Sequence, residues 1–172
     1  MIGRIATMKP TDDVDRIVAA WHRERPDLDL APMEVLSRVT RLAKRLDQVR
    51  REAFTTYGLD AWSFDVLAAL RRAGDPYELS PGQLVQETLV TSGTMTNRVD
   101  RLVDAGFVAR RPDPDDRRGV LVQLTAEGRT RVDAAFADLI AAERALLVGI
   151  DAEDQGTLAG QLRRVMTTIE ER

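Results

Sequence analysis

The sequence predicts a mainly α-helical protein with a small β wing, arranged as a winged helix-turn-helix with a helical dimerisation layer. Apolar residues recur at helical spacing along most of the chain, which is the primary signal of amphipathic helices. One stretch, residues 107–124, instead reads as two short strands around the turn-forming segment PDPDDRRG. Two short helices joined by a brief turn precede this hairpin, and that order of elements is typical of a winged helix-turn-helix.

The composition limits the kind of protein this can be. A chain of 172 residues is long enough for one domain, or for one domain plus a dimerisation layer. It has no cysteine, which excludes a disulfide framework, a thiolate metal site and a thiol-based redox sensor. Its single histidine, His22, has no nearby cysteine or second histidine, so neither a metal site nor a hydrolase constellation is expected. We expect no cofactor.

The charge and hydropathy patterns bear on location and partners. No apolar run approaches the roughly 20 residues that a membrane span needs. The first residues also lack the apolar segment of a secretory signal. We therefore expect a cytoplasmic protein without a membrane partner. The net charge of −3 weighs against nucleic-acid binding unless a local basic surface lies apart from the acidic residues.

The first half of the chain reads as three helices. The first should begin at Thr11 and end before Pro26, with Trp21 as a packing residue. The second should span about Pro32 to Tyr57, with an apolar stripe and a basic solvent side that is either a solvated face or a surface near DNA phosphate. Asp60 should cap the third, which ends at Gly74.

Two capping patterns mark the helix-turn-helix. Ser80 is followed by proline and, three residues later, by Gln83, which predicts a capping box at the start of a short helix. Thr91 should cap the next helix, and Gly106 should end it. The apolar side of the helix that begins at Thr91 should face the core. Its other side carries short polar residues and arginines that fit the major groove of DNA, where such side chains read base edges. The hairpin tip can place Arg117 or Arg118 against phosphates or in the minor groove.

The last two helices suggest self-association. Thr125 and Asp151 should cap them, and both carry apolar stripes, which include Leu139 and Leu162. A second copy of the chain is the simplest cover for these stripes, and a two-fold dimer would place two reading helices about one DNA turn apart. We therefore expect an N-terminal extra helix and linker (1–31), a helical dimerisation region (32–57 and 125–172) and a DNA-binding region (58–124).

The run TSGTMTNRVDRLVDAGFV followed by DPDDRRGVLVQLT resembles the winged helix-turn-helix of the MarR family of transcriptional regulators. The family pattern of Asp, any residue, Arg in the wing falls on Asp116 and Arg118. The resemblance implies a homodimeric, ligand-responsive regulator, most simply a repressor, bound to a pseudo-palindromic operator in double-stranded DNA. It implies that DNA is contacted by Ser80, Thr91, Ser92, Gly93, Thr94, Thr96, Asn97, Arg101, Arg111, Asp116, Arg117 and Arg118.

The additional N-terminal helix resembles the branch of this family that responds to urate. The ligand pocket attributed to that branch falls on Trp21, Asp65, Arg98 and Arg110. A planar anionic heterocycle could stack on the indole and accept hydrogen bonds from the guanidinium groups. If Asp65 and Arg98 pair when the ligand is absent, disrupting that pair could shift the reading helix. The alternative interpretation is a structural ion pair and a core tryptophan.

Other classes of function remain as alternatives. The sequence shows no glycine-rich phosphate loop, no nucleophile elbow and no metal-ligand cluster, so we predict that the protein is not an enzyme. The regulator could respond to a different organic acid. The winged helix could also serve as a protein-interaction module that does not bind DNA, because fold alone does not decide function.

Overall fold

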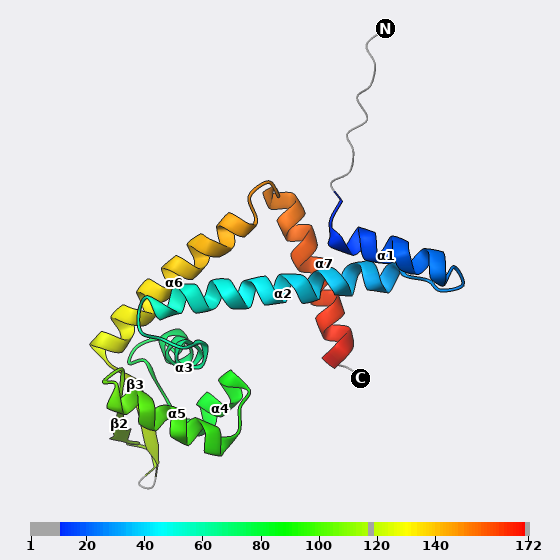
Figure 1. The fold of residues 1–172 in the computed structure, drawn as a ribbon. Coiled ribbons are helices and arrows are strands. Elements are labelled where there is room, and N and C mark those ends of the chain that lie inside the picture. The colour runs from blue at the N-terminus through cyan, green and yellow to red at the C-terminus, as the bar shows by residue number, and fades with distance from the viewer. Residues whose placement is uncertain (1–10, 117–118, 171–172) are drawn as a thin grey trace. The chain divides into compact units, whose positions relative to one another are not determined.

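The computed structural model describes residues 11–116 and 119–170, and these are mainly helical (Figure 1). The chain divides into two compact units, residues 1–48 and 49–172, with the boundary inside helix α2 (Ala31–Thr55). Within the described residues, no helix is long and apolar enough to cross a lipid bilayer.

In the first unit, ion pairs join helix α1 (Asp13–Glu24) to the first half of α2. The Asp12 carboxylate caps α1, accepting hydrogen bonds from the amides of Val14 and Asp15, so the helix starts two residues later than the predicted Thr11. Arg38 of α2 donates to Asp12 Oδ2 at 2.8 Å and to Asp15 Oδ1 at 2.7 Å. The Arg38 guanidinium thereby holds the pKa of the Asp12 carboxyl below its usual range.

The second unit is built around one apolar core. Helices α3 (Ala61–Arg72), α4 (Pro81–Thr88), α5 (Ser92–Asp104) and α6 (Ala126–Leu146) contribute to it, together with the end of α2. Phe54 and Phe64 stack with their ring centroids 4.0 Å apart. Leu139 of α6 is only 4% exposed and belongs to this core, so its predicted place in a dimer layer is wrong.

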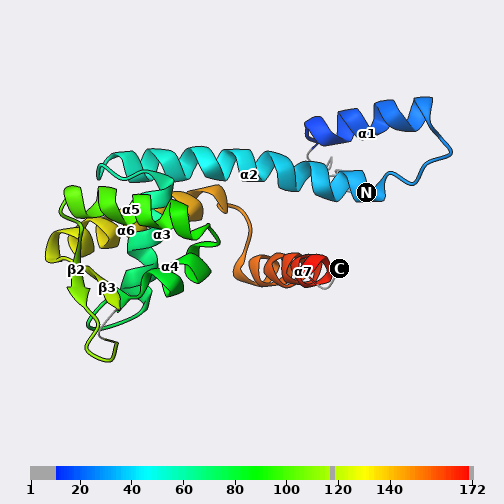
Figure 2. The ribbon, with the colours of Figure 1, turned by 90° about the horizontal axis from the view of Figure 1, so that it is seen from below.

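Three short strands form the wing, and the two longer ones are labelled in Figure 2. The antiparallel sheet has the order β1-β3-β2, in which β1 is Glu78–Leu79, β2 is Val108–Pro112 and β3 is Val120–Leu124. The two longer strands pair in register from Val108 opposite Leu124 to Pro112 opposite Val120. The predicted hairpin is confirmed, and its first strand, β2, lies beside α5. Residues 117–118, between β2 and β3 in the sequence, lie outside the described residues.

The wing and α6 meet at a tight joint. Thr125 caps α6 as predicted, accepting from the Gly128 amide at 3.0 Å while its hydroxyl lies 3.0 Å from the Phe107 carbonyl oxygen. A Cβ atom on Gly128 would lie only 2.1 Å from that carbonyl oxygen. The close approach of two backbone segments therefore requires glycine here.

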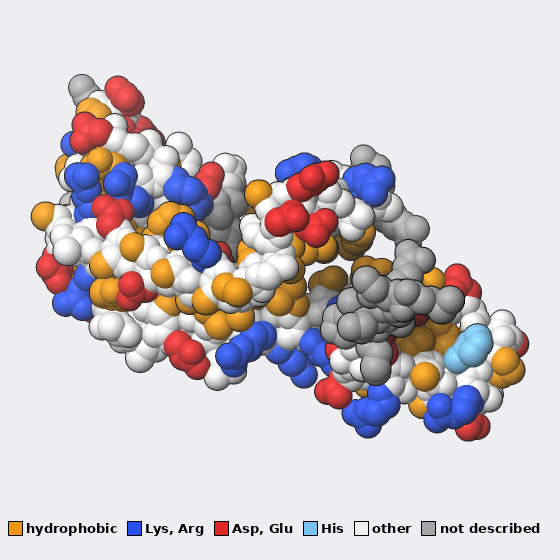
Figure 3. All heavy atoms as spheres, turned by 90° about the horizontal axis from the view of Figure 1, so that it is seen from above, with side chains coloured by type: hydrophobic (Ala, Val, Ile, Leu, Met, Phe, Trp, Pro, Cys, Tyr) orange, Lys and Arg blue, Asp and Glu red, His pale blue; other side chains and the backbone are white. Residues whose placement is uncertain are grey.

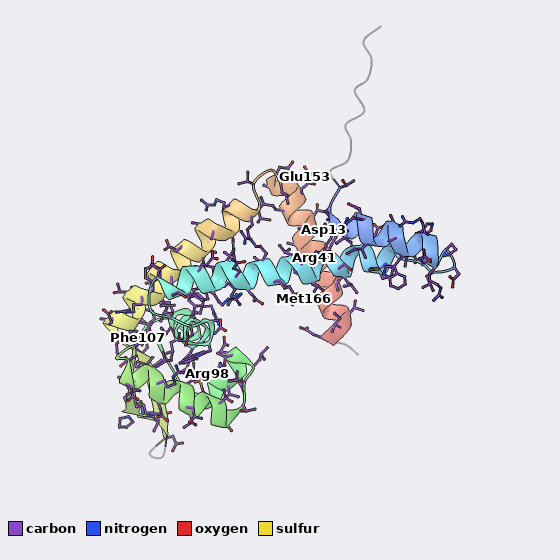
Figure 4. All side chains as sticks on the ribbon, in the orientation of Figure 1. Asp13, Arg41, Arg98, Phe107, Glu153 and Met166 are labelled. Carbon is purple, nitrogen blue, oxygen red and sulfur yellow. The ribbon has the colours of Figure 1, made fainter. Side chains whose placement is uncertain are left out.

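Helix α7 (Ala152–Glu170) buries none of its residues. Asp151 accepts a hydrogen bond from the Asp154 amide, which confirms the predicted cap. Met166, labelled in Figure 4, and Ile169 are 61% and 66% exposed. Exposed hydrophobic side chains lie between charged ones in the space-filling view of Figure 3. Large exposed apolar surfaces on a folded chain mark interaction sites.

Candidate nucleic-acid interface

Local hydrogen bonds define the helix-turn-helix. The Ser80 hydroxyl accepts from the Gln83 amide while the Gln83 side chain accepts from the Ser80 amide, so the predicted capping box is confirmed. Helix α4 ends at Thr88, and the next residue, Leu89, has a left-handed backbone conformation with a φ of 54° that ends the helix. Thr91 then caps α5 through its hydroxyl, which accepts from the Thr94 amide. The short turn between the two caps fixes α5 against α4.

Helix α5 has an inner and an outer face. Met95, Val99 and Leu102 are at most 2% exposed and anchor the helix in the core. The opposite side is open to solvent and carries the small polar residues predicted to meet DNA, namely Ser92, Gly93, Thr94, Thr96 and Asn97, together with Arg101. A helix held by one apolar face that presents short polar groups on the other suits insertion into the major groove.

Two arginines of α5 lie against a tryptophan of α3. The guanidinium carbon of Arg101 is 4.6 Å from the Trp62 ring centroid, and that of Arg98 is 5.7 Å from it. Arg98, labelled in Figure 4, lies on the part of α5 that meets α3. Asp60 holds the predicted cap position of α3, but its side chain caps no backbone amide and instead accepts a hydrogen bond from the Trp62 indole at 2.9 Å.

The arginines at the base of the wing are paired with carboxylates. Arg110 of β2 donates to Asp100 of α5 at 2.6 Å, which connects the wing to the reading helix α5. Arg111 pairs with Glu78 of β1. At the tip, Asp116 is exposed, whereas the predicted Arg117 and Arg118, and the suggested pair between Asp116 and Arg118, lie outside the described residues.

The predicted ligand residues of the second unit contact different partners in this structure: Arg98 lies against Trp62, and Arg110 pairs with Asp100. Asp65 forms its ion pair with Arg50 at 3.1 Å, so the suggested pair with Arg98 is wrong. A single sequence does not show which arginine of a distant helix will reach a given carboxylate. Trp21 lies on α1 in the first unit and is 50% exposed, so it is not a core residue, and its roles in packing and in ligand binding stay predictions.

A cavity of about 310 Å³ lies beside Asp65 in the second unit. Its lining includes Phe64 and two arginines, Arg50 and Arg72, and Arg72 pairs with Glu87 of α4 at 3.1 Å. The cavity can therefore offer an aromatic ring and two guanidinium groups to a small anion. Among the described residues, no group of three or more acidic, histidine or cysteine side chains could hold a metal ion.

Comparison with known proteins decides the family. Residues 57–119, from just after α2 to the residue before β3, match the MarR family. The transcriptional regulator PecS of Dickeya dadantii is 39% identical over 153 residues, which cover 89% of this chain and 92% of PecS. The chain belongs to the MarR family. It is a MarR-type transcriptional regulator and not an enzyme, as predicted.

Further DNA-binding regulators resemble the chain in sequence or in structure. The transcriptional repressor YetL of Bacillus subtilis is 32% identical over 62% of this chain and 64% of its own length. A mutant MarR of Escherichia coli in complex with operator DNA is 29% identical with a TM-score of 0.66, covering 80% of this chain and 99% of that one. BpsR of Bordetella bronchiseptica, whose DNA binding is regulated by 6-hydroxynicotinic acid, is 26% identical with a TM-score of 0.64 over 77% of this chain and 92% of its own.

Within this MarR-family fold, sequence reasoning missed three side chains near the candidate sites. Trp62 was not singled out, yet two arginines of α5 lie against its ring. Arg50 and Arg72 were not singled out as ligand residues, although both line the cavity beside Asp65. Their charge was visible in the sequence, but the partner that each arginine selects depends on the packing of α2, α3 and α4.

Proposed function

We propose that the protein is a homodimeric repressor that binds a pseudo-palindromic operator and is released by an anionic aromatic small molecule. The observation that carries this proposal is the exposed polar face of α5, held by buried Met95, Val99 and Leu102 beside the β2–β3 wing. The similar MarR in complex with operator DNA supports the DNA partner, and the repressor YetL supports the direction of regulation.

The DNA contacts divide by chemistry. Small polar groups on the outer face of α5, from Ser92 to Asn97, read base edges in the major groove. Arg101 and the wing contact phosphates, which position the protein without selecting a sequence. The proposed contacts at the caps and in the wing are Ser80, Thr91, Arg111, Asp116, Arg117 and Arg118.

A second copy of the chain covers the exposed apolar residues. Helix α7 has no buried residue, and Phe136 of α6 is 53% exposed. In the first unit, Val35 and Leu36 of α2 are each 54% exposed. In a two-fold dimer each such surface meets the same surface of its partner, and the two reading helices reach successive turns of the operator.

The effector site centres on Asp65. An anion that enters the cavity beside it competes with the carboxylate for Arg50 and gains a second guanidinium from Arg72. Arg72 also pairs with Glu87 of α4, so an anion that binds Arg72 weakens a contact of α4, the helix that precedes the reading helix α5. The family resemblance adds Trp21, Arg98 and Arg110 to the ligand residues, and urate is the proposed ligand. Regulation of BpsR by 6-hydroxynicotinic acid supports an aromatic acid as the chemical class.

A gel-shift titration on the DNA upstream of the protein's own gene tests this proposal. We expect a shifted complex that competitor DNA of scrambled sequence does not displace, and we expect urate to release it. A parallel arm with 6-hydroxynicotinic acid separates urate from another aromatic acid. Absence of a sequence-preferring complex would contradict the DNA-binding function, whereas a complex indifferent to both acids would contradict only the effector.

Arg50→Gln tests the cavity itself. This variant removes a guanidinium that an entering anion needs, so we expect weaker release by the effector while operator binding without effector is kept. Exposed Arg163 of α7 provides a matched control, because Arg163→Gln removes the same charge on a different helix. Equal effector response in both variants would place the ligand elsewhere.

A further inference from the structure

We propose that Trp62 is a positioning residue that holds Arg98 and Arg101 of the reading helix on one indole ring, so that Arg101 meets operator phosphate already oriented. This inference rests on the proposed DNA-binding function and adds a residue that none of the DNA contacts includes. Three observations support it. The Trp62 ring is fixed by a hydrogen bond to Asp60, Asp60 does not cap the α3 backbone, and the guanidinium groups of the two arginines lie over the ring.

The Trp62 ring is fixed on α3. Trp62 lies in the first turn of the helix, is half-buried and packs against the core of the second unit. Its indole N–H donates to Asp60 Oδ2 at 2.9 Å, which sets the rotation of the ring. A large aromatic side chain held both by packing and by its polar edge is a rigid surface.

Asp60 binds the Trp62 indole instead of capping the backbone of α3. An aspartate at the cap position normally accepts from a backbone amide of the first turn, and this stabilises the helix. Here the carboxylate makes no such bond and instead accepts from Trp62, while lying 3.9 Å from the nearest nitrogen of Arg101. Places where a protein departs from a local rule are expected at functional sites.

Arg98 and Arg101 approach the ring from α5. Residues three apart on a helix share a face, so both guanidinium groups can reach the same indole. Their central carbons lie 5.7 Å and 4.6 Å from its centroid, within the range of cation–π attraction. The side chain of Arg101 remains 67% exposed.

Stacking leaves hydrogen-bond donors free. All five N–H groups of a guanidinium lie in its plane, so contact through the flat face orients the donor edge without occupying it. Arg50, Arg110 and Arg111 instead spend donors on Asp65, Asp100 and Glu78. Among the described residues, no carboxylate lies within ion-pairing distance of Arg98. Arg101 forms an ion pair with Asp60, but at 3.9 Å the two groups are too distant for a hydrogen bond, so the pair uses none of the Arg101 donors. Trp62 thus orients Arg101, whose exposed side chain keeps its hydrogen-bond donors for an anion.

A double-mutant cycle on operator affinity tests the proposal. Trp62→Leu keeps an apolar contact with the core but removes the aromatic face, and we expect it to weaken operator binding roughly fivefold, which corresponds to about 1 kcal/mol. Trp62→Phe restores the face and should recover most of that loss. The double variant Trp62→Leu, Arg101→Ala should bind no more weakly than Arg101→Ala alone, because the ring acts through that arginine. Thr94→Ala, also on α5, serves as the control partner, and its effect should multiply with that of Trp62→Leu.

A second measurement works without DNA. In a Trp21→Phe background, Trp62 is the remaining one of the two tryptophans, so its fluorescence reports the ring directly. Removal of Arg101 uncovers the ring, and Arg101→Ala should therefore increase collisional quenching by acrylamide, whereas Thr94→Ala should not. This measurement also serves if Trp62→Leu fails to fold.

The outcomes separate the two ideas. If the wild-type protein binds its operator but Trp62→Leu and Arg101→Ala act independently, or Trp62→Phe binds as weakly as Trp62→Leu, the positioning role is wrong and the DNA-binding function stands. If the wild type binds no operator, the proposed function fails. If Arg101→Ala leaves the acrylamide quenching of Trp62 unchanged, the proposed stacking of Arg101 on the Trp62 ring is wrong in either case.

Discussion

Gly128 lies where the first turn of α6 approaches Phe107, the residue before β2. Its backbone faces the Phe107 carbonyl, and Thr125 bridges the same point by accepting from Gly128 and contacting that carbonyl through its hydroxyl. The joint sets where the wing leaves the core, and therefore where its tip can meet DNA.

Gly128→Ala should destabilise the fold. The added methyl group would lie 2.1 Å from the Phe107 carbonyl oxygen, so the backbone must shift. We expect a loss of about 1–3 kcal/mol in the free energy of unfolding, measured by urea denaturation. Gly156→Ala is the matched control, because Gly156 lies in α7 with nothing within 4 Å of the added atom. That variant should be neutral or slightly stabilising, since alanine lowers the entropy of the unfolded chain. Equal destabilisation by both would contradict the close approach.

Residue roles that depend on near neighbours were predictable from sequence, and those that depend on distant ones were not. The caps at Ser80, Thr91 and Thr125 follow from side chains within three residues. The partner of Asp65 does not, because Arg50 on α2 reaches it only once α2 and α3 are packed. Asp60 shows the limit clearly, since its cap position was predicted but its hydrogen bond to Trp62 was not.

At the scale of elements, α1 depends on charged side chains. Arg38 binds Asp12 at the cap of α1 and Asp15 in its first turn, and Val14 between them is buried. The order of helices, strands and turns was predictable because each carries its own periodicity and caps. The assignment of a helix face to the chain's own core or to a partner was not, as Leu139 shows.

The attachment of α1 should be lost in acid. Arg38 lowers the pKa of Asp12 below its usual 3.8. A group whose pKa is depressed by folding contributes stability above its unfolded value, and this is lost as the pH falls through the folded value. Trp21 fluorescence in a Trp62→Phe background should therefore report loosening of α1 below about pH 4. Arg38→Met removes the ion pairs and should move the change to higher pH. An identical acid transition in both proteins would contradict this role.

Helix α7 should determine the oligomeric state. Met166→Asp places a charge on an apolar face that is 61% exposed in a single chain, so it should leave the fold of each chain intact. In a dimer the charge would be buried at a cost of several kcal/mol. We expect monomers at micromolar concentration by sedimentation, and lost operator binding. Gln161→Asp adds the same charge at an exposed polar position and should remain dimeric. Monomeric wild-type protein would end the two-fold arrangement.

At the scale of the whole molecule, regulation requires that the effector bind the DNA-free and DNA-bound states with different affinities, typically by about 1–3 kcal/mol. The second unit offers connected elements for this coupling. The cavity beside Asp65 borders α3 and α4, and Arg110 and Trp62 each join α5 to a neighbouring element. An effector that withdraws Arg50 from Asp65 would thus act on helices that support the reading helix.

The central claim is that α5 and the wing bind operator DNA, and a salt-dependent anisotropy titration tests it most directly. Wild-type protein and Arg118→Ala would be titrated against a labelled duplex from upstream of the gene and against a scrambled duplex. We expect tight, sequence-preferring binding by the wild type that falls steeply with salt. Arg118→Ala should bind more weakly with a salt slope lower by about one, and with unchanged thermal stability. Equal wild-type affinity for both duplexes, or an Arg118→Ala affinity and salt slope identical to those of the wild type, would contradict it.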